Sequence, residues 1–437
     1  MRVVVVGAGL SGLFTACDLI GRGVDDVVVV ERSDEPGGVT RTIVRDGFML
    51  EPGAGSFLLP HTDLGHLLDV VGAGVTPAPP SASVRYLYID GQLIELPASP
   101  KALLAPVLPV ATKLRALAEP LVRSKTSGDE SLLTFCQRRF GTRAGDLISW
   151  MMASGVFAGD PRRLSVRSAF SALTDLEDHG GSVIGGAIKK RRGRTGPLPA
   201  AHLPVGGMSA VVGSAAAVLG DRLHTGFKVE SLHEAGGSWE VDGPDSLTAD
   251  AVVVATDPAQ ASGILGGNLG ARLAGTPTAP VTVVGLGGSD DKARIPQGFG
   301  ALVGAGESMV TRGVLFESSY APDRAPDGSW FMKVIAGGAT NPEVVEWEET
   351  RLVDRLVLES SRIVGFDLVP TFVEVARHRP GIPQYDVGHD RWLGGVQSLV
   401  DARPGLALTG WGYRGVGVAQ LASDARAVAR SLVGAPT

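Results

Sequence analysis

The chain opens with Arg2-Val3-Val4-Val5-Val6-Gly7-Ala8-Gly9-Leu10-Ser11-Gly12, and this stretch decides the fold. An unbroken run of valines is typical of a buried parallel strand. The glycines that follow have the spacing of a dinucleotide-binding turn: Gly7 permits the tight turn, Gly9 lets the main chain approach a pyrophosphate, and Gly12 allows helix and strand to pack closely. The stretch predicts a strand that turns directly into a helix, whose N-terminus offers N–H groups to phosphates.

An acidic residue follows at the expected place. Val27 to Val30 is a second buried strand, and Glu31 stands directly after it, nineteen residues beyond Gly12. A carboxylate there accepts hydrogen bonds from ribose hydroxyls and repels a 2′-phosphate. Gly37-Gly38 adds further main-chain N–H groups, a pattern that resembles FAD-binding rather than NAD-binding proteins. FAD is therefore the expected cofactor, and it is expected to be non-covalent because no Ser-Gly-Gly-Cys attachment sequence stands near the C-terminus.

Composition excludes several other classes of protein. The 437 residues exceed one ordinary core, and the net charge of -6 argues against a general nucleic-acid surface. With only two cysteines, Cys17 and Cys136, no disulfide framework is expected, and a reducing cytoplasm is the expected location. The 8 histidines show no metal-ligand spacing, so no metal site is expected.

Further buried strands at 251–255 and 406–409 indicate a nucleotide-binding domain that is interrupted by insertions. The sequence predicts an α/β protein with a Rossmann-type FAD/NAD(P)-binding domain, a mixed α+β substrate domain and a helical insert. The expected bounds are 1–65, 205–257 and 384–437 for the FAD-binding domain, 86–204 for the insert, and 66–85 with 258–383 for the substrate domain. The apolar stretch 97–121 in the insert is broken by prolines and charges, so it can lie on a membrane surface but cannot span it.

Four segments resemble protoporphyrinogen oxidases and the related coproporphyrinogen oxidases of Gram-positive bacteria. They are Asp46–Phe57, Ser154–Ser165, Gly381–His389 and Gly410–Val418, and Arg324–Gly328 and Gly337–Asn341 also fit. The resemblance runs nearly from end to end. It implies that an anionic tetrapyrrole, a porphyrinogen, loses six electrons in three rounds of hydride transfer to the flavin, which molecular oxygen reoxidises, in heme biosynthesis. Because the cofactor carries this chemistry, no catalytic side chain is identified.

Two other functions stay open at this point. One is a different flavin oxidase of the same fold, acting on an amine, a carotenoid precursor or another metabolite. The other is a flavin-containing protein without turnover.

The resemblance also implies site residues. Arg85 is expected to bind a substrate propionate, because a guanidinium fork binds a carboxylate through two hydrogen bonds; the alternative is a surface arginine on an amphipathic strand. Gly159 is expected where the main chain approaches the macrocycle; the alternative is an ordinary turn glycine. The expected FAD-binding residues are Gly7, Gly9, Leu10, Ser11, Gly12, Glu31, Arg32, Gly37, Gly38, Gly55, Ser56, Val229, Gly410, Trp411, Val416, Gly417 and Val418.

Three positions depart from the family pattern. Trp411 stands where the family usually has asparagine, Gly53-Ala54-Gly55 replaces Gly-Pro-Asn, and Arg312-Gly313 stands where the family tends to have Leu-Gly. An additional arginine near the substrate suits a substrate with more carboxylates, such as coproporphyrinogen. Arg312 is therefore the third expected substrate-binding residue.

Overall fold

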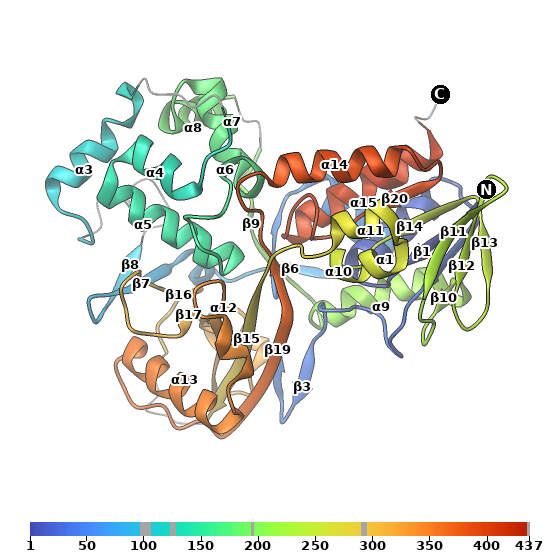
Figure 1. Ribbon diagram of the computed structural model, residues 1–437. Coiled ribbons are helices and arrows are strands. Elements are labelled where there is room, and N and C mark those ends of the chain that lie inside the picture. The colour runs from blue at the N-terminus through green and yellow to red at the C-terminus, as the bar shows by residue number, and fades with distance from the viewer. Residues whose placement is uncertain (97–105, 123–127, 194–195, 290–294, 435–437) are drawn as a thin grey trace.

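The structure is a computed structural model that describes residues 1–96, 106–122, 128–193, 196–289 and 295–434. Figure 1 shows a sheet wrapped by helices on the right, a second sheet with two long strands at the lower left, and a group of helices above that second sheet. The two ends of the chain lie on the same side of the molecule, beside the first sheet.

The first sheet is parallel throughout, with the order β10-β2-β1-β14-β20. Its strands are β1 (Arg2–Val6), β2 (Asp26–Val30), β14 (Ala251–Val254), β20 (Leu406–Leu408) and β10 (Leu223–His224). Val3 and Val5 face one side of the sheet, and Val4 and Val6 face the other, all of them buried. The predicted α/β fold class is confirmed, and β10 is a strand that the sequence pattern does not predict.

Helices cover one face of this sheet and a mixed layer covers the other. The first face holds α1 (Leu10–Gly21), α9 (Met208–Leu219) and α15 (Val418–Val433), with α2 (Thr62–Val71) packed against them. The second face holds β11 (Ser231–Ala235), β12 (Ser238–Asp242), β13 (Leu247–Ala249), α10 (Pro258–Leu265), α11 (Gly267–Leu273) and α14 (His389–Asp401). Because the strands are parallel, the segments that follow their carboxyl ends meet at one edge of the sheet.

The second sheet has the order β19-β15-β18-β17-β16-β7-β8. Its strands are β19 (Phe372–Pro383), β15 (Thr278–Gly288), β18 (Trp330–Gly337), β17 (Thr311–Leu315), β16 (Gly300–Val303), β7 (Arg85–Ile89) and β8 (Gln92–Leu96). All its pairs are antiparallel except β16 with β7. Helix α13 (Glu349–Val364) packs Leu352 and Leu356 on one face, and α12 (Glu317–Tyr320) follows β17.

The helical part contains α3 (Val110–Leu117), α4 (Leu132–Phe140), α5 (Thr142–Met152), α6 (Val166–Ala169), α7 (Ser171–Gly180) and α8 (Val183–Arg192). A π-turn, Ala153–Phe157, continues α5. Phe135, Phe157 and Leu164 form the core of the helical part, together with Tyr385 from the distant C-terminal region.

The predicted division of the chain into three domains stays a prediction, but the observed sheets cross its boundaries. Strands β7 and β8 lie within 86–204 and belong to the second sheet, and β9 (Ala200–Pro204) pairs with β5 (Phe57–Leu59) and β6 (Val75–Pro77). A short hairpin, β3 (Ile43–Arg45) with β4 (Phe48–Leu50), completes the strands. Residues 97–105 of the apolar stretch lie outside the described residues. No helix in the described part is both long and apolar enough to cross a membrane.

Candidate functional site

The glycine turn between β1 and α1 is shaped by steric limits. Gly7 has φ +103°, and a Cβ added to Gly12 would lie 1.9 Å from the main-chain oxygen of Gly7, so only glycine fits there. A Cβ added to Gly9 would meet no protein atom within 4 Å. No side chain caps the N-terminus of α1, whose first two residues are Leu10 and Ser11. This turn can therefore offer main-chain N–H groups to an anionic ligand.

Glu31 lies beside that turn. Its buried carboxylate accepts hydrogen bonds from the main-chain N–H groups of Ala8 at 2.8 Å and Ser33 at 2.9 Å. The main-chain N–H of Gly37 donates to the oxygen of Ala8 at 2.8 Å, and Gly37 pairs with Gly9 as an isolated parallel bridge. The fold thus brings the two glycine groups and the acid together, although 23 residues separate Glu31 from Ala8.

A cavity of about 400 Å³ opens at this edge of the parallel sheet. Four predicted residues line it: Gly7, Glu31, Arg32 and Val229. The lining residues that were not predicted are Val6, Val30, Phe227, Lys228, Glu230, Thr256, Gln260, Gly263 and Ile264. Thr256 could have been found, because it follows the buried strand β14. Main-chain donors, the buried carboxylate of Glu31 and apolar side chains such as Val6 and Val30 fit the adenosine and pyrophosphate part of FAD.

The segment Gly410–Val418 lies between β20 and α15. The carboxylate of Asp424 accepts hydrogen bonds from the N–H of Gly410 at 3.2 Å and the hydroxyl of Thr409 at 2.8 Å. Gly417 is the N-cap of α15, Val418 is its first residue, and Trp411 and Val416 are half-buried. The predicted C-terminal residues are therefore on one short loop, held at its start by a buried carboxylate.

Tyr385 also holds this loop, and the sequence pattern did not single it out. Its hydroxyl donates to the main-chain oxygen of Trp411 and accepts from the N–H of Gly415 at 2.8 Å. Its ring stacks on His389 with 4.1 Å between the ring centroids. Burial raises the pKa of the Tyr385 hydroxyl, so it stays a hydrogen-bond donor at neutral pH.

Gly55 and Ser56 follow a segment that is tied to the second sheet by buried charges. Lys333 on β18 donates to the main-chain oxygens of Glu51 at 3.1 Å and Gly53 at 3.3 Å, and Arg324 donates to that of Gly55. Glu317 pairs with Arg324 at 2.6 Å and with Lys333 at 3.5 Å. Burial raises the pKa of Glu51, although Arg324 opposes it. These contacts fix the main chain of 51–55 against the sheet.

Of the three predicted substrate-binding residues, two are in contact and the third lies apart. Gly159 and Arg312 are in contact, because Nη2 of Arg312 donates to the oxygen of Gly159 at 3.0 Å. A Cβ added to Gly159 would lie 2.7 Å from Oε1 of Gln384, so the turn leaves no room for a side chain. Arg85 lies apart from these two, exposed at the start of β7, with its guanidinium 5.4 Å from the ring centroid of Phe299. Among the described residues, no carboxylate forms an ion pair with Arg85.

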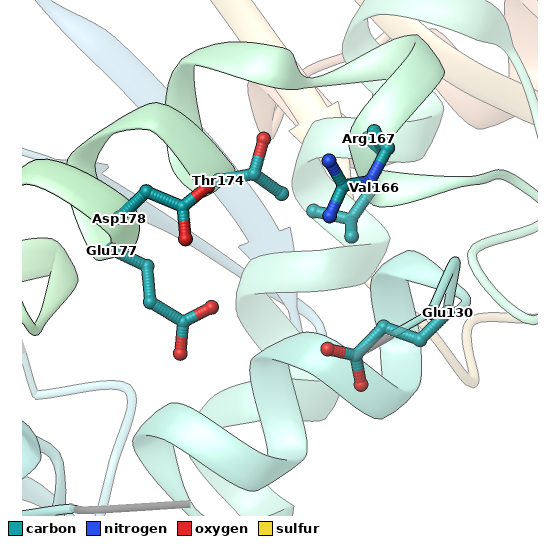
Figure 2. Close-up of a pocket in the computed structure, with 7 residues that line it drawn as sticks. Glu130, Val166, Arg167, Thr174, Glu177 and Asp178 are labelled. Atoms are coloured by element: carbon teal, nitrogen blue, oxygen red, sulfur yellow. The ribbon is translucent and has the colours of Figure 1, made fainter. Parts of the chain in front are cut away.

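A second cavity, in the helical part, is small and polar (Figure 2). Glu177, Asp178 and Thr174 reach it from α7, Arg167 from α6, and Glu130 from the segment before α4. Arg138 pairs with Glu130 at 2.6 Å and with Glu177 at 2.8 Å, and these hydrogen bonds raise its pKa although burial lowers it. A volume of about 30 Å³ is suited to water rather than to a macrocycle. In the described part of the chain, no group of histidine, cysteine and acidic residues could hold a metal ion.

Comparison with known proteins gives a consistent result. Residues 10–431 match the family described as flavin containing amine oxidoreductase. The chain is 30% identical to the chloroplastic protoporphyrinogen oxidase of Nicotiana tabacum, covering 99% of this chain and 85% of that protein. It is 25% identical to the coproporphyrinogen III oxidase of Bacillus subtilis, covering 95% and 94%.

Solved structures share the fold. A protein of Exiguobacterium sp. 255-15, assigned as a protoporphyrinogen oxidase, superposes with a TM-score of 0.84 at 21% identity, covering 99% of this chain and 98% of that one. Putrescine oxidase superposes with a TM-score of 0.74 at 17% identity, covering 99% and 98%.

Proposed function

The chain belongs to the flavin containing amine oxidoreductases and takes FAD as its cofactor, and from this premise we propose that it oxidises a porphyrinogen to the porphyrin. The substrate is coproporphyrinogen III or protoporphyrinogen IX, the electron acceptor is molecular oxygen, and the product serves heme biosynthesis. The observation that carries the proposal is the extent of similarity to relatives named for these substrates, which includes the helical part and the second sheet. These are the parts expected to contact the substrate.

FAD held by the glycine turn and Glu31 would supply a two-electron acceptor, and the overall reaction would convert one porphyrinogen and three oxygen molecules into one porphyrin and three hydrogen peroxide molecules. The protein then has to hold and orient a large, non-planar macrocycle and exclude other reactions. Arg85 provides a guanidinium for one propionate, and its exposed position leaves the fork accessible. Gly159, two residues beyond the π-turn, lets the main chain there face the macrocycle without a side chain, and any side chain at this position would displace Gln384.

A related flavin oxidase that acts on an amine or another metabolite is the second candidate. Trp411 favours it, because a half-buried indole stands where porphyrinogen oxidases usually carry asparagine. The similarity in fold to putrescine oxidase is compatible with either substrate class.

The proposed function is tested by supplying both porphyrinogens, and separately putrescine, to the FAD-loaded protein under air. Porphyrin fluorescence and peroxide should rise together with at least one porphyrinogen. In the Arg85→Leu variant, KM should rise about tenfold with an unchanged flavin spectrum, because a charged hydrogen bond is lost. Arg362→Leu, which changes an exposed arginine on α13, is the matched control. Peroxide with putrescine and no porphyrin would contradict the proposal.

The proposal includes a peripheral membrane contact of the helical part. Val110, Leu114 and Leu117 are exposed, and their spacing places them on one face of α3; Leu121, in the 3₁₀ turn that follows, is exposed as well. An apolar stripe of this kind suits the surface of a bilayer. Co-sedimentation with phospholipid vesicles should fall in a Leu114→Gln, Leu121→Gln variant. Equal sedimentation of the two proteins would exclude this contact.

A further inference from the structure

Arg312 differs from the other buried cations of the described chain. The other three are Arg139, Arg324 and Lys333. Arg139 pairs with Glu119, and both Arg324 and Lys333 pair with Glu317. Arg312 forms no ion pair with any described residue, although only 4% of it is exposed. A buried charge without an opposite charge destabilises the folded chain, so its environment calls for an additional partner.

The contacts of Arg312 leave part of its guanidinium without a hydrogen-bond partner. Nη1 donates to the hydroxyl of Thr340 at 2.8 Å, and Nη2 donates to the main-chain oxygen of Gly159 at 3.0 Å. The group lies 4.6 Å from the ring centroid of Trp150. Nε has no hydrogen-bond partner in the described structure. Because a guanidinium carries five N–H donors, these neutral contacts orient the fork without neutralising it.

Burial lowers the pKa of Arg312 to about 10, and the charge of Asp160 opposes this shift. The side chain is therefore still protonated at neutral pH. Asp160 itself pairs with Arg162 at 2.7 Å.

A β-bulge directs Arg312 toward the helical part. Thr311 is opposite Ala336 on β18, and Gly313 is opposite Ile335, so Arg312 is the additional residue between two consecutive pairs. Bulges of this kind change the direction of a side chain and are frequent beside active sites. Here the bulge places the guanidinium against Gly159, the glycine expected at the macrocycle.

Arg85 and Arg312 lie on the same side of the second sheet. Arg85 is in register with Gly300, and Gly300 with Leu315; two residues further on, Leu302 is in register with Gly313. Leu302 faces the π-turn, because a Cβ on Gly155 would lie 3.4 Å from its side chain. Two strand spacings and three residues along the strand separate the Cα atoms of the two arginines by roughly 14 Å. This separation is comparable to the span of a tetrapyrrole with its propionate arms.

We propose that Arg312 binds a substrate carboxylate on the side of the macrocycle opposite the carboxylate at Arg85, and that the natural substrate therefore carries carboxylates on both sides. This inference rests on the proposed function and narrows its substrate. Protoporphyrinogen IX has two propionates on neighbouring rings, at one edge. Coproporphyrinogen III has one propionate on each of its four rings, so it can satisfy both arginines at once. The tetracarboxylate is the substrate class that this arrangement fits.

The test uses stable porphyrins as probes of the FAD-loaded protein. Binding of coproporphyrin III, its tetramethyl ester and protoporphyrin IX is measured from quenching of tryptophan fluorescence, for wild type, Arg312→Leu and Arg312→Lys. Wild type should bind coproporphyrin III most tightly. Arg312→Leu should weaken that affinity about ten- to hundredfold and leave the other two affinities within about twofold, because only the extra charged contact is lost. Arg312→Lys should give an intermediate loss, since it keeps the charge without the fork.

Two results would overturn the proposal. Equal loss for all three porphyrins in Arg312→Leu would mean that Arg312 only braces the sheet against the helical part. Unchanged affinity for coproporphyrin III would mean that it does not contact the ligand. Thermal unfolding and FAD content of each variant identify a folding defect. If Arg312→Leu is defective in folding, the affinities of Arg312→Lys for the three porphyrins decide whether Arg312 contacts the ligand. If wild type binds and oxidises no tetrapyrrole, the proposed function itself fails, and the inference fails with it.

Discussion

Tyr385 and Trp411 are joined by a hydrogen bond from the phenol hydroxyl to the main-chain oxygen, and the same hydroxyl accepts the N–H of Gly415 at 2.8 Å. One buried side chain therefore satisfies two main-chain groups of the loop that precedes α15. Phe157 of the helical part packs edge-on against the Tyr385 ring, with 5.5 Å between the ring centroids. Tyr385 thus connects the expected flavin loop with the turn that carries Gly159.

Replacing Tyr385 with phenylalanine should loosen this loop. The change leaves a carbonyl and an N–H without their partner, and we expect the free energy of unfolding to fall by about 1–3 kcal/mol. FAD should also dissociate more readily, as measured by flavin released on dilution. Tyr413→Phe is the matched control, because Tyr413 is equally buried and its hydroxyl has no hydrogen-bond partner among the described residues. A similar loss in both variants would show that the hydroxyl contacts of Tyr385 are unimportant.

Sequence reasoning succeeded where the signal is local. The strand, glycine turn, helix and second strand that end at Glu31 are consecutive, so the turn and the acid could be placed together from their spacing. Tyr385 could not be placed in this way, because its two partners lie 26 and 30 residues further along the chain. The bond depends on how the loop folds back over the sheet, which no local pattern encodes.

The environment of Arg312 was also beyond local reasoning. The residue could be recognised as a departure from a family pattern, but a bulge is visible only when β17 and β18 are paired. The same holds for Lys333, which looks like an ordinary strand lysine in the sequence. Its ammonium group is buried against the carboxylate of Glu317 and the main-chain oxygen of Glu51, which come from segments outside β18. Long-range pairing, rather than propensity, determines these positions.

Glu31 should contribute to FAD affinity through its charge. Glu31→Gln keeps the size of the side chain but weakens its acceptance of ribose hydroxyls, and we expect Kd for FAD to rise roughly ten- to hundredfold. Quenching of flavin fluorescence by FAD-free protein measures this affinity. Glu35→Gln removes the same charge from an exposed position four residues away and should change Kd by less than about twofold. Equal effects of the two substitutions would assign the loss to net charge alone.

Lys333 should be needed for the stability of the buried charge cluster. Lys333→Met leaves Glu51, Glu317 and Arg324 with an uncompensated negative charge, and we expect a loss of about 3–5 kcal/mol in urea unfolding. Adding Glu317→Gln to this variant restores neutrality and should recover part of the loss. A double-mutant cycle measures the coupling between the two residues. Independent, additive effects would contradict the view that the four side chains act as one network.

His389 should make the protein less stable in mild acid. Its ring is buried between Tyr385 and Trp392, and burial lowers its pKa, although the hydrogen bond to the oxygen of Tyr413 opposes this. The imidazole of the unfolded chain therefore takes up a proton at a higher pH than that of the folded chain. The contribution of neutral His389 to the free energy of unfolding is complete above the ordinary histidine pKa of about 6.5 and is lost as pH falls toward the lowered pKa. Urea unfolding of wild type and His389→Gln between about pH 8 and pH 5 tests this. The difference in unfolding free energy between the two proteins should shrink as pH falls, and a difference that is constant, or that grows in acid, would show that folding does not suppress protonation of His389.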